Sequence, residues 1–295
     1  MRDLQGFPFN PPQYRYASRM NISRRRFLGV AAGAGALAAA GCADAFLFEP
    51  DRVLLTRHEV RVRGLAPALD GLRIAQVTDV HFPYNLVAAQ ATLEHLRRER
   101  PEIVVLTGDM VERVYALPQL EAFARAARGS IATIATLGNW EYYAHATAQA
   151  TDVYRRAGAD LLVNARREVE VGGASLVVVG LDDPVMGSPD IIQARRGLAT
   201  GRLEVWLVHA PGFVENPPGR LGATPAVVLS GHTHGGQIRF PLLPPVTPTG
   251  SGRFVAGWYR DTFAPLYVSR GIGTTMIHAR FLCPPELPIF TLRSG

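Results

Sequence analysis

The chain has 295 residues, of which 47% are hydrophobic and 19% charged, which is enough for one sizeable core and excludes general disorder. Its formal net charge is +6, but residues 1–45 hold six arginines against two aspartates, so +4 lies in this segment and +2 in the rest. Every basic residue is an arginine, which excludes a lysine nucleophile. The nearly neutral remainder does not indicate a nucleic-acid partner.

The first 45 residues have the pattern of an export signal. Ser23-Arg24-Arg25-Arg26-Phe27-Leu28 precedes a small, apolar run from Gly29 to Ala40. This run has about a dozen residues, which is short for a bilayer-spanning helix of roughly 20. The string resembles a twin-arginine signal, whose export machinery moves folded proteins. We therefore expect residues 1–45 to be a twin-arginine signal peptide, and residues 46–295 to work in the periplasm or on the outer face of the cytoplasmic membrane.

Two processing sites remain open after the apolar run. Ala39-Ala40-Gly41-Cys42 resembles a lipoprotein cleavage box with Ala in place of the usual Leu, and a lipid on Cys42 would hold the protein at the membrane. Ala43-Asp44-Ala45 fits ordinary signal peptidase equally well. The other cysteine, Cys283, stands alone, so we expect no disulfide framework in the mature chain.

From about residue 60, strand-like and helix-like segments alternate along the chain. This order predicts an α/β fold in which two sheets form a layered sandwich and ligands gather at the carboxyl ends of strands. Pro241–Pro248 predicts a surface loop. The predicted helices cover 86–96, 118–127 and 146–157. The predicted strands cover 72–77, 103–106, 131–137, 161–163, 167–171, 175–181, 203–208, 226–229, 253–259, 265–269 and 287–292.

Five polar clusters each follow a predicted buried strand. Together they offer two carboxylates, one carboxamide and four imidazoles, a mixed set that suits Mn²⁺, Fe or Zn²⁺ better than Ca²⁺. The Asp-x-His and His-x-His spacings place both side chains on one side of an extended segment. The clusters are Asp79-Val80-His81, Gly108-Asp109, Gly138-Asn139-Trp140-Glu141, His209 and Gly231-His232-Thr233-His234-Gly235-Gly236.

With these clusters in this order, the chain resembles a calcineurin-like metallophosphoesterase from about residue 70 to its end. Gly235-Gly236-Gln237 and the tail from Ser269-Arg270-Gly271 through Arg280 to Pro285-Glu286 resemble a branch of exported or membrane-associated bacterial phosphodiesterases. That branch includes relatives that act on lipid-linked pyrophosphates. The resemblance implies a four-layer sandwich, with two central mixed β-sheets flanked by helices.

The resemblance also implies a ligand set for two divalent metal ions. Asp79, His81 and His234 would bind the first, and Asn139, His209 and His232 would bind the second, with Asp109 bridging. A hydroxide bound to the metals would then attack a phosphodiester or pyrophosphate in line, on a substrate that includes lipid-linked envelope intermediates. Asn139 would also position the phosphate.

Trp140 departs from the family pattern, which commonly has His at this position. An indole N–H donates a hydrogen bond but does not cycle a proton near neutral pH. Trp140 therefore favours diester or pyrophosphate substrates with good leaving groups, unless His145 or Tyr142 supplies the proton. The competing hypothesis is a metal-binding envelope protein with impaired catalysis.

Overall fold

The computed structural model describes residues 24–215 and 224–295. The first part of the predicted signal peptide, residues 1–23 with Ser23, lies outside the described residues. Helix α1 (Arg24–Leu47) continues past the predicted apolar run, and contacts divide the chain between Ala40 and Gly41. Within the described part of the chain, one helical segment, Phe27–Asp51, is long and apolar enough to cross a membrane by length and composition alone. The folded domain comprises residues 41–295.

The first of two mixed sheets in this domain contains β1 (Leu54–Val62), β2 (Arg73–Val77), β3 (Ile103–Thr107), β4 (Ala132–Thr136), β5 (Asp160–Leu161) and β12 (Glu286–Ser294). Its order is β1-β12-β2-β3-β4-β5. The strands from β2 to β5 are parallel, whereas β12 runs antiparallel to β2 and parallel to β1. The carboxyl ends of β2, β3 and β4 therefore meet at one edge.

The second sheet contains β6 (Ala165–Val171), β7 (Ala174–Gly180), β8 (Glu204–Leu207), β9 (Val227–Ser230), β10 (Gly257–Tyr259) and β11 (Leu266–Val268). Its order is β10-β11-β9-β8-β7-β6, and the central strands from β11 to β7 are parallel. Gln76 on β2 donates to the carbonyl oxygen of Ser230 on β9 at 3.0 Å, which joins the two sheets next to their carboxyl ends.

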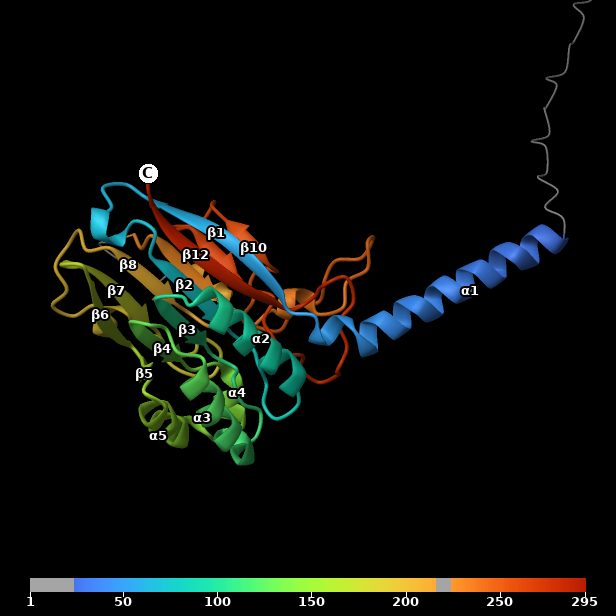
Figure 1. Cartoon of the computed structure of the whole chain (residues 1–295), viewed down its shortest axis with the longest axis horizontal. Helices are drawn as coiled ribbons and strands as arrows, with labels where there is room; N and C mark the ends of the chain where they lie inside the picture. Colours follow the sequence, from blue (N-terminus) through green and yellow to red (C-terminus); the bar gives the residue numbers. More distant parts are fainter. Residues whose placement is uncertain (1–23, 216–223) are drawn as a thin grey trace, which may run out of the picture. The chain divides into compact units, whose positions relative to one another are not determined.

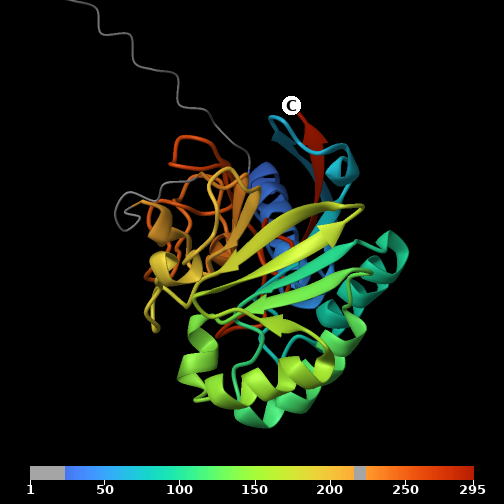
Figure 2. The same ribbon diagram turned by 90° about the vertical axis from the view of Figure 1, so that its left-hand side faces the viewer.

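Helices cover the outer face of the first sheet, as Figures 1 and 2 show. They are α2 (Leu86–Glu99), α3 (Leu117–Ala126) and α5 (Thr147–Ala157). The outer face of the second sheet is covered more thinly, by α6 (Ile191–Ala194), the 3-10 helix Pro211–Val214 and loops. A short helix, α4 (Asn139–Tyr143), begins directly after β4 at the carboxyl edge. The remaining 3-10 helices span Glu49–Asp51, Pro67–Leu69, Val114–Ala116 and His234–Gly236.

Three apolar clusters separate these layers, and the pleat of the strands assigns residues to them. Ile74 on β2 faces the second sheet, whereas its neighbour Ala75 faces the helices. On β8, Val205 faces the first sheet and Trp206 the outer layer. Alternation with a period of two explains this division, because successive side chains point to opposite faces.

The predicted α/β sandwich with two mixed sheets flanked by helices is confirmed. The predicted helices and strands occur within a few residues of their expected bounds, and Pro241–Pro248 forms a loop. Strand β1 and the short helices α4 and α6 were not predicted. Strand β1 has only Val60 buried along its length, so its sequence lacks the apolar signal of a central strand.

Replacement of Leu106 by Ala should lower the free energy of unfolding by about 2–5 kcal/mol, because Leu106 on β3 is fully buried between the first sheet and its helices. Urea denaturation of the full chain measures this loss. The matched control is Leu86→Ala at an exposed position on α2, which should change the free energy by no more than about 0.5 kcal/mol. Equal effects of the two substitutions would contradict the layer assignment.

Candidate metal centre

The predicted ligands lie at the carboxyl edge of both sheets. Asp79 follows β2 by two residues, Asp109 follows β3 by two, His209 follows β8 by two, and His232 follows β9 by two. Asn139 is the first residue of α4, just after β4. Because neighbouring parallel strands end at the same edge, loops far apart in the sequence converge there.

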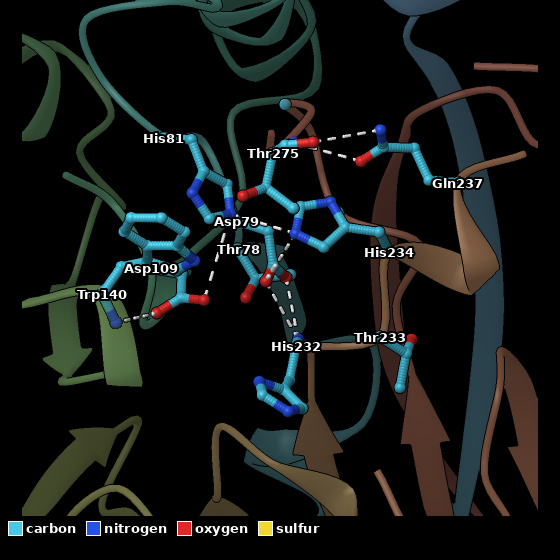
Figure 3. Close-up of polar contacts among 12 residues, drawn as sticks. Thr78, Asp79, His81, Asp109, Trp140, His232, Thr233, His234, Gln237 and Thr275 are labelled. Carbon is cyan, nitrogen blue, oxygen red and sulfur yellow. Dashed lines mark hydrogen bonds and ion pairs between the residues drawn. The ribbon is translucent and has the colours of Figure 1, made fainter. Parts of the chain in front are cut away.

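The structure brings six of these side chains into two buried groups. Among the described residues, each group offers three ligand atoms that lie within 4.8 Å of one another. The first group is Asp79, His81 and His234, and the second is Asp109, His209 and His232. Figure 3 shows the first group together with Asp109, His232 and Trp140.

Asp109 lies between the two groups. Its Oδ2 atom is 3.1 Å from Nε2 of His209 and 3.9 Å from Nε2 of His81. In the first group, the Nε2 atoms of His81 and His234 are 3.0 Å apart, and Nε2 of His234 is 3.6 Å from Oδ1 of Asp79. This arrangement fits the predicted bridging position of Asp109, and the assignment of individual ligands stays a prediction.

Unpaired polar atoms at this edge fit metal binding. Within the described residues, Oδ1 of Asn139 and Nδ1 of His232 are buried and make no hydrogen bond. Buried polar atoms normally find a partner, because leaving them unpaired costs about 1–3 kcal/mol each. Divalent cations would supply that partner, and the mixed oxygen and nitrogen donors suit transition metals. The two groups therefore form a dinuclear site for divalent metal ions.

The electrostatics of the second group depend on a buried ion pair. Burial opposes the charge of Asp109, yet the adjacent His209 outweighs it and holds the pKa of this carboxyl well below its ordinary value. Burial likewise lowers the pKa of His209, but the Asp109 carboxylate raises it above its ordinary value. For His232, burial and the charge on His209 lower the pKa to about 4. A neutral His232 keeps a lone pair for a metal ion.

Five candidate ligands have a left-handed backbone. Their φ angles lie between 50° and 70°, in a region that L side chains rarely adopt. Each such conformation costs on the order of 1–3 kcal/mol and persists only where the surroundings enforce it. These residues are Asp79, His81, Asp109, His232 and His234.

Glu141 holds the backbone of two ligand loops together. Its Oε2 accepts hydrogen bonds from the N–H groups of Asp109 and Gly138, and its Oε1 from those of Met110 and Val111. The four distances run from 2.6 to 3.1 Å, and the side chain is fully buried. Burial and the charge of Asp109 raise the pKa of Glu141 to about 7, while the N–H donors oppose this rise.

Two further acidic residues belong to the site but were not predicted. Oε1 of Glu112 lies 3.0 Å from Nδ1 of His81, where it can orient the imidazole, as carboxylates behind metal-binding histidines do. Asp183 is fully buried after β7, and its Oδ2 accepts from the N–H groups of Val185 and Met186. Asp183 follows a strand end like the predicted ligands, which was the available signal.

Tyr142 and His145, the two residues suggested as proton donors in place of the missing histidine, differ in their surroundings. The hydroxyl of Tyr142 donates to Oδ1 of Asp182, and burial together with this contact raises the pKa of Tyr142 well above its ordinary value. His145 is exposed. Neither contacts the two ligand groups through a hydrogen bond among the described residues, whereas the ring of Trp140 makes an edge contact with His81 at 5.8 Å between centroids.

Comparisons with known proteins agree with this geometry. The family profile described as calcineurin-like phosphoesterase matches residues 72–236. The chain is 28% identical to the uncharacterized metallophosphoesterase YkuE of Bacillus subtilis (strain 168) over 287 residues, which are 92% of this chain and 98% of that protein. It is 26% identical to the phosphodiesterase YaeI of Escherichia coli (strain K12) over 287 residues, which are 92% of this chain and 99% of that protein.

Replacement of Glu141 by Gln should lower the free energy of unfolding by roughly 2–6 kcal/mol, because an amide nitrogen would face two N–H donors and leave them unpaired. Urea denaturation of the protein freed of metal with a chelator separates this loss from metal binding. Glu94→Gln on the exposed face of α2 is the control, with a change below about 1 kcal/mol. If Glu141→Gln behaved like the control, Glu141 would not hold these loops.

Proposed function

Because the chain belongs to the calcineurin-like phosphoesterases, we propose that it hydrolyses phosphodiesters or pyrophosphates of the cell envelope, lipid-linked ones included. Its broader activity is that of a metal-dependent hydrolase of phosphoester bonds. The observation that carries the proposal is the pair of buried ligand groups at the carboxyl edge, with Trp140 beside them.

The proposed ligand set follows the two groups. Asp79, His81 and His234 would hold one ion, while His209, His232 and Asn139 would hold the other, with Asp109 shared between them; Asn139 is added to the two groups on account of its unpaired, buried Oδ1. When bound, two divalent cations lower the pKa of a coordinated water and neutralise the phosphoryl oxygens. The identity of the metals, whether Mn²⁺, Zn²⁺ or Fe, is left to metal analysis.

The chain's own residues position these parts. Glu112 orients His81 through Nδ1, and Thr107 does the same for His209, whose Nδ1 lies 2.8 Å from the Thr107 carbonyl oxygen. Asn139 has its amide group at the buried edge, where its N–H can donate to a phosphate oxygen. Trp140 offers no titratable proton, so the reaction depends on a leaving group that departs without strong acid assistance. Diesters with activated leaving groups and pyrophosphates meet this condition.

The export proposal rests on the leader. The twin-arginine string and the following apolar helix support export through the twin-arginine machinery to the outer face of the cytoplasmic membrane. The structure favours Cys42 over Ala45 as the processing site. Cys42 is exposed, whereas Ala45 is buried and its carbonyl oxygen accepts from the N–H of Arg280 at 2.9 Å. Cleavage after Ala45 would remove residues 41–45 from the folded domain, together with the hydrogen bond between Ala45 and Arg280.

The second candidate function is metal binding at the envelope with impaired catalysis. Trp140 is the observation that favours it, because the usual histidine is missing from an otherwise complete set of ligands. The two candidates differ in turnover and not in metal content.

Replacement of Asp109 by Asn should lower metal-dependent hydrolysis of bis-p-nitrophenyl phosphate by at least about 100-fold, because the shared ligand loses its charge. The purified variant should also contain less metal than wild type. Asp152→Asn on the exposed face of α5 is the control and should keep full activity and metal content. Full turnover by the Asp109 variant would reject the proposed mechanism.

Replacement of Trp140 by His should raise turnover of p-nitrophenyl phosphate relative to the diester by at least about tenfold, because an imidazole beside His81 can protonate a leaving group. Both substrates are assayed after loading with Mn²⁺. Tyr143→His, at an exposed aromatic residue that contacts Trp140, is the control and should leave the ratio unchanged. A wild-type protein that binds metal but turns over neither substrate would favour the second candidate function.

A further inference from the structure

Two loops of the domain carry unusually exposed apolar side chains. Residues 240–249 contain no charged residue, and Leu242 and Val246 are 95% and 85% exposed. In the loop 274–283, Met276 is 96% exposed. Single apolar residues on a surface need no explanation, but a contiguous apolar area marks a binding surface.

The two loops form one surface. Their backbones pair between Ile238 and Phe281, and the rings of Phe240 and Phe281 lie 5.6 Å apart. The side chain of Gln237 donates to the carbonyl oxygens of Thr275 and Ile277 and accepts from the N–H of Thr275. These bonds hold the exposed tips at fixed positions relative to each other.

The chain enters the domain at this same surface. Cβ added at Gly41 would lie 3.6 Å from the Phe281 ring, and the buried Glu49 carboxylate accepts from the N–H groups of Leu282 and Cys283. Between these points, Phe46, Leu47 and Phe48 are exposed. Figure 1 shows the orange and red loops next to residues 41–47 at the end of α1. We call residues 46–48, 240–246 and 276–282 the apolar face.

We propose that the apolar face rests on the surface of a lipid bilayer. The chain reaches the domain through an apolar helical segment that is long enough to cross a membrane, and the exposed Cys42 lies just before the face. A retained helix or a lipid at Cys42 therefore places this surface against the bilayer. The face is also free of exposed carboxylates: none occurs in 240–249 or 274–283, and Glu49 is buried. Apolar loops of this kind gain free energy by burial at the boundary between headgroups and acyl chains.

The apolar face reaches the candidate metal centre through one loop. A pocket of about 290 Å³ is lined by Met276 and Ile277 on one side and by Trp140 and Glu112 on the other. Glu112 contacts His81, so the pocket adjoins the first ligand group. If the substrate is lipid-linked, as the proposed function has it, its apolar part can stay near the bilayer while its phosphate reaches the metals. Only this last step rests on the proposed function.

The test measures contact with lipid and not turnover. The full chain carries Cys42→Ser, so that the remaining native cysteine, Cys283, is buried. Each protein then receives one exposed labelling site, either Leu242→Cys or Met276→Cys. The control site is Ile192→Cys on α6, where the native side chain is 73% exposed. Each fluorescently labelled protein is reconstituted into phosphatidylcholine–phosphatidylglycerol vesicles that carry a nitroxide on the lipid headgroup. We expect the lipid-borne nitroxide to quench the labels at 242 and 276 severalfold more than the label at 192.

A second comparison separates docking of the face from simple tethering. Leu243→Asp should reduce quenching of the label at 276 severalfold, whereas Ile192→Asp should leave it unchanged, since both positions are exposed and neither supports the core. Equal quenching at 242, 276 and 192, or protection of 242 and 276 by self-association without lipid quenching, would overturn the proposal. Loss of phosphoesterase activity does not enter either readout, so the proposed function can fail independently.

Discussion

Buried charge at the carboxyl edge of the sheets is the constraint on which the rest of the structure depends. The carboxyl groups of Asp79, Asp109 and Glu141 are all buried at this edge, an arrangement that is costly unless each is paired and hydrogen-bonded. The backbone supplies much of that compensation. Asp79 accepts from the N–H of His232, Asp109 from that of Trp140, and Glu141 from four N–H groups. All of these bonds except the one from Gly138 cross between loops, so compensating the charge also assembles the site.

The same bonds explain why strained backbones persist at the site. A left-handed Asp79 or Asp109 would relax to an ordinary conformation if its loop were free. Gly231 and Gly138 let the neighbouring backbones approach: a Cβ at Gly138 would lie 2.3 Å from Oδ1 of Asp109, and one at Gly231 would lie 2.3 Å from Oδ2 of Asp79. The glycines of the motifs therefore make room for the carboxylates that the N–H groups hold. Strain, close approach and hydrogen bonding form one cooperative unit.

This unit also shows what the sequence could and could not predict. The positions of Asp79, Asp109, His209 and His232 were readable because each follows an apolar strand by a fixed short distance. The role of Glu141 could not be predicted, because it depends on the directions of N–H groups that the left-handed backbone at Asp109 sets. Glu112 was missed for a similar reason, since it lies five residues beyond β3 and reaches His81 through the backbone pairing of Phe82 with Val111 and Glu112.

The pairing of segments that lie far apart in the sequence was also not predictable from the sequence alone. Strand β1 lies parallel to β12 at the far end of the chain, and most of its side chains are at least partly exposed, so neither periodicity nor burial marks it. The apolar face was not predictable from the sequence for the same reason. Residues 46–48 lie about two hundred positions before the loops at 240 and 276. Tertiary contacts bring these segments together, among them the hydrogen bonds of Gln237 and Glu49 and the backbone bridge between Ile238 and Phe281.

At Trp140, the backbone and the side chain have separate roles: the backbone helps to hold the ligand loops, and the side chain lies beside the ligand groups. Its backbone N–H donates to Asp109 at 2.8 Å, which any residue other than proline can do, so the Asp109 carboxylate is held whatever the side chain. The indole itself lies between His81 and the pocket that reaches the apolar face. An aromatic ring there removes a proton donor but adds an apolar wall beside the ligand groups. The two buried ligand groups and an absent histidine are therefore compatible within one site. Under the proposed function, the indole changes which leaving group the site can serve, while the backbone bond from Trp140 to Asp109 stays in place.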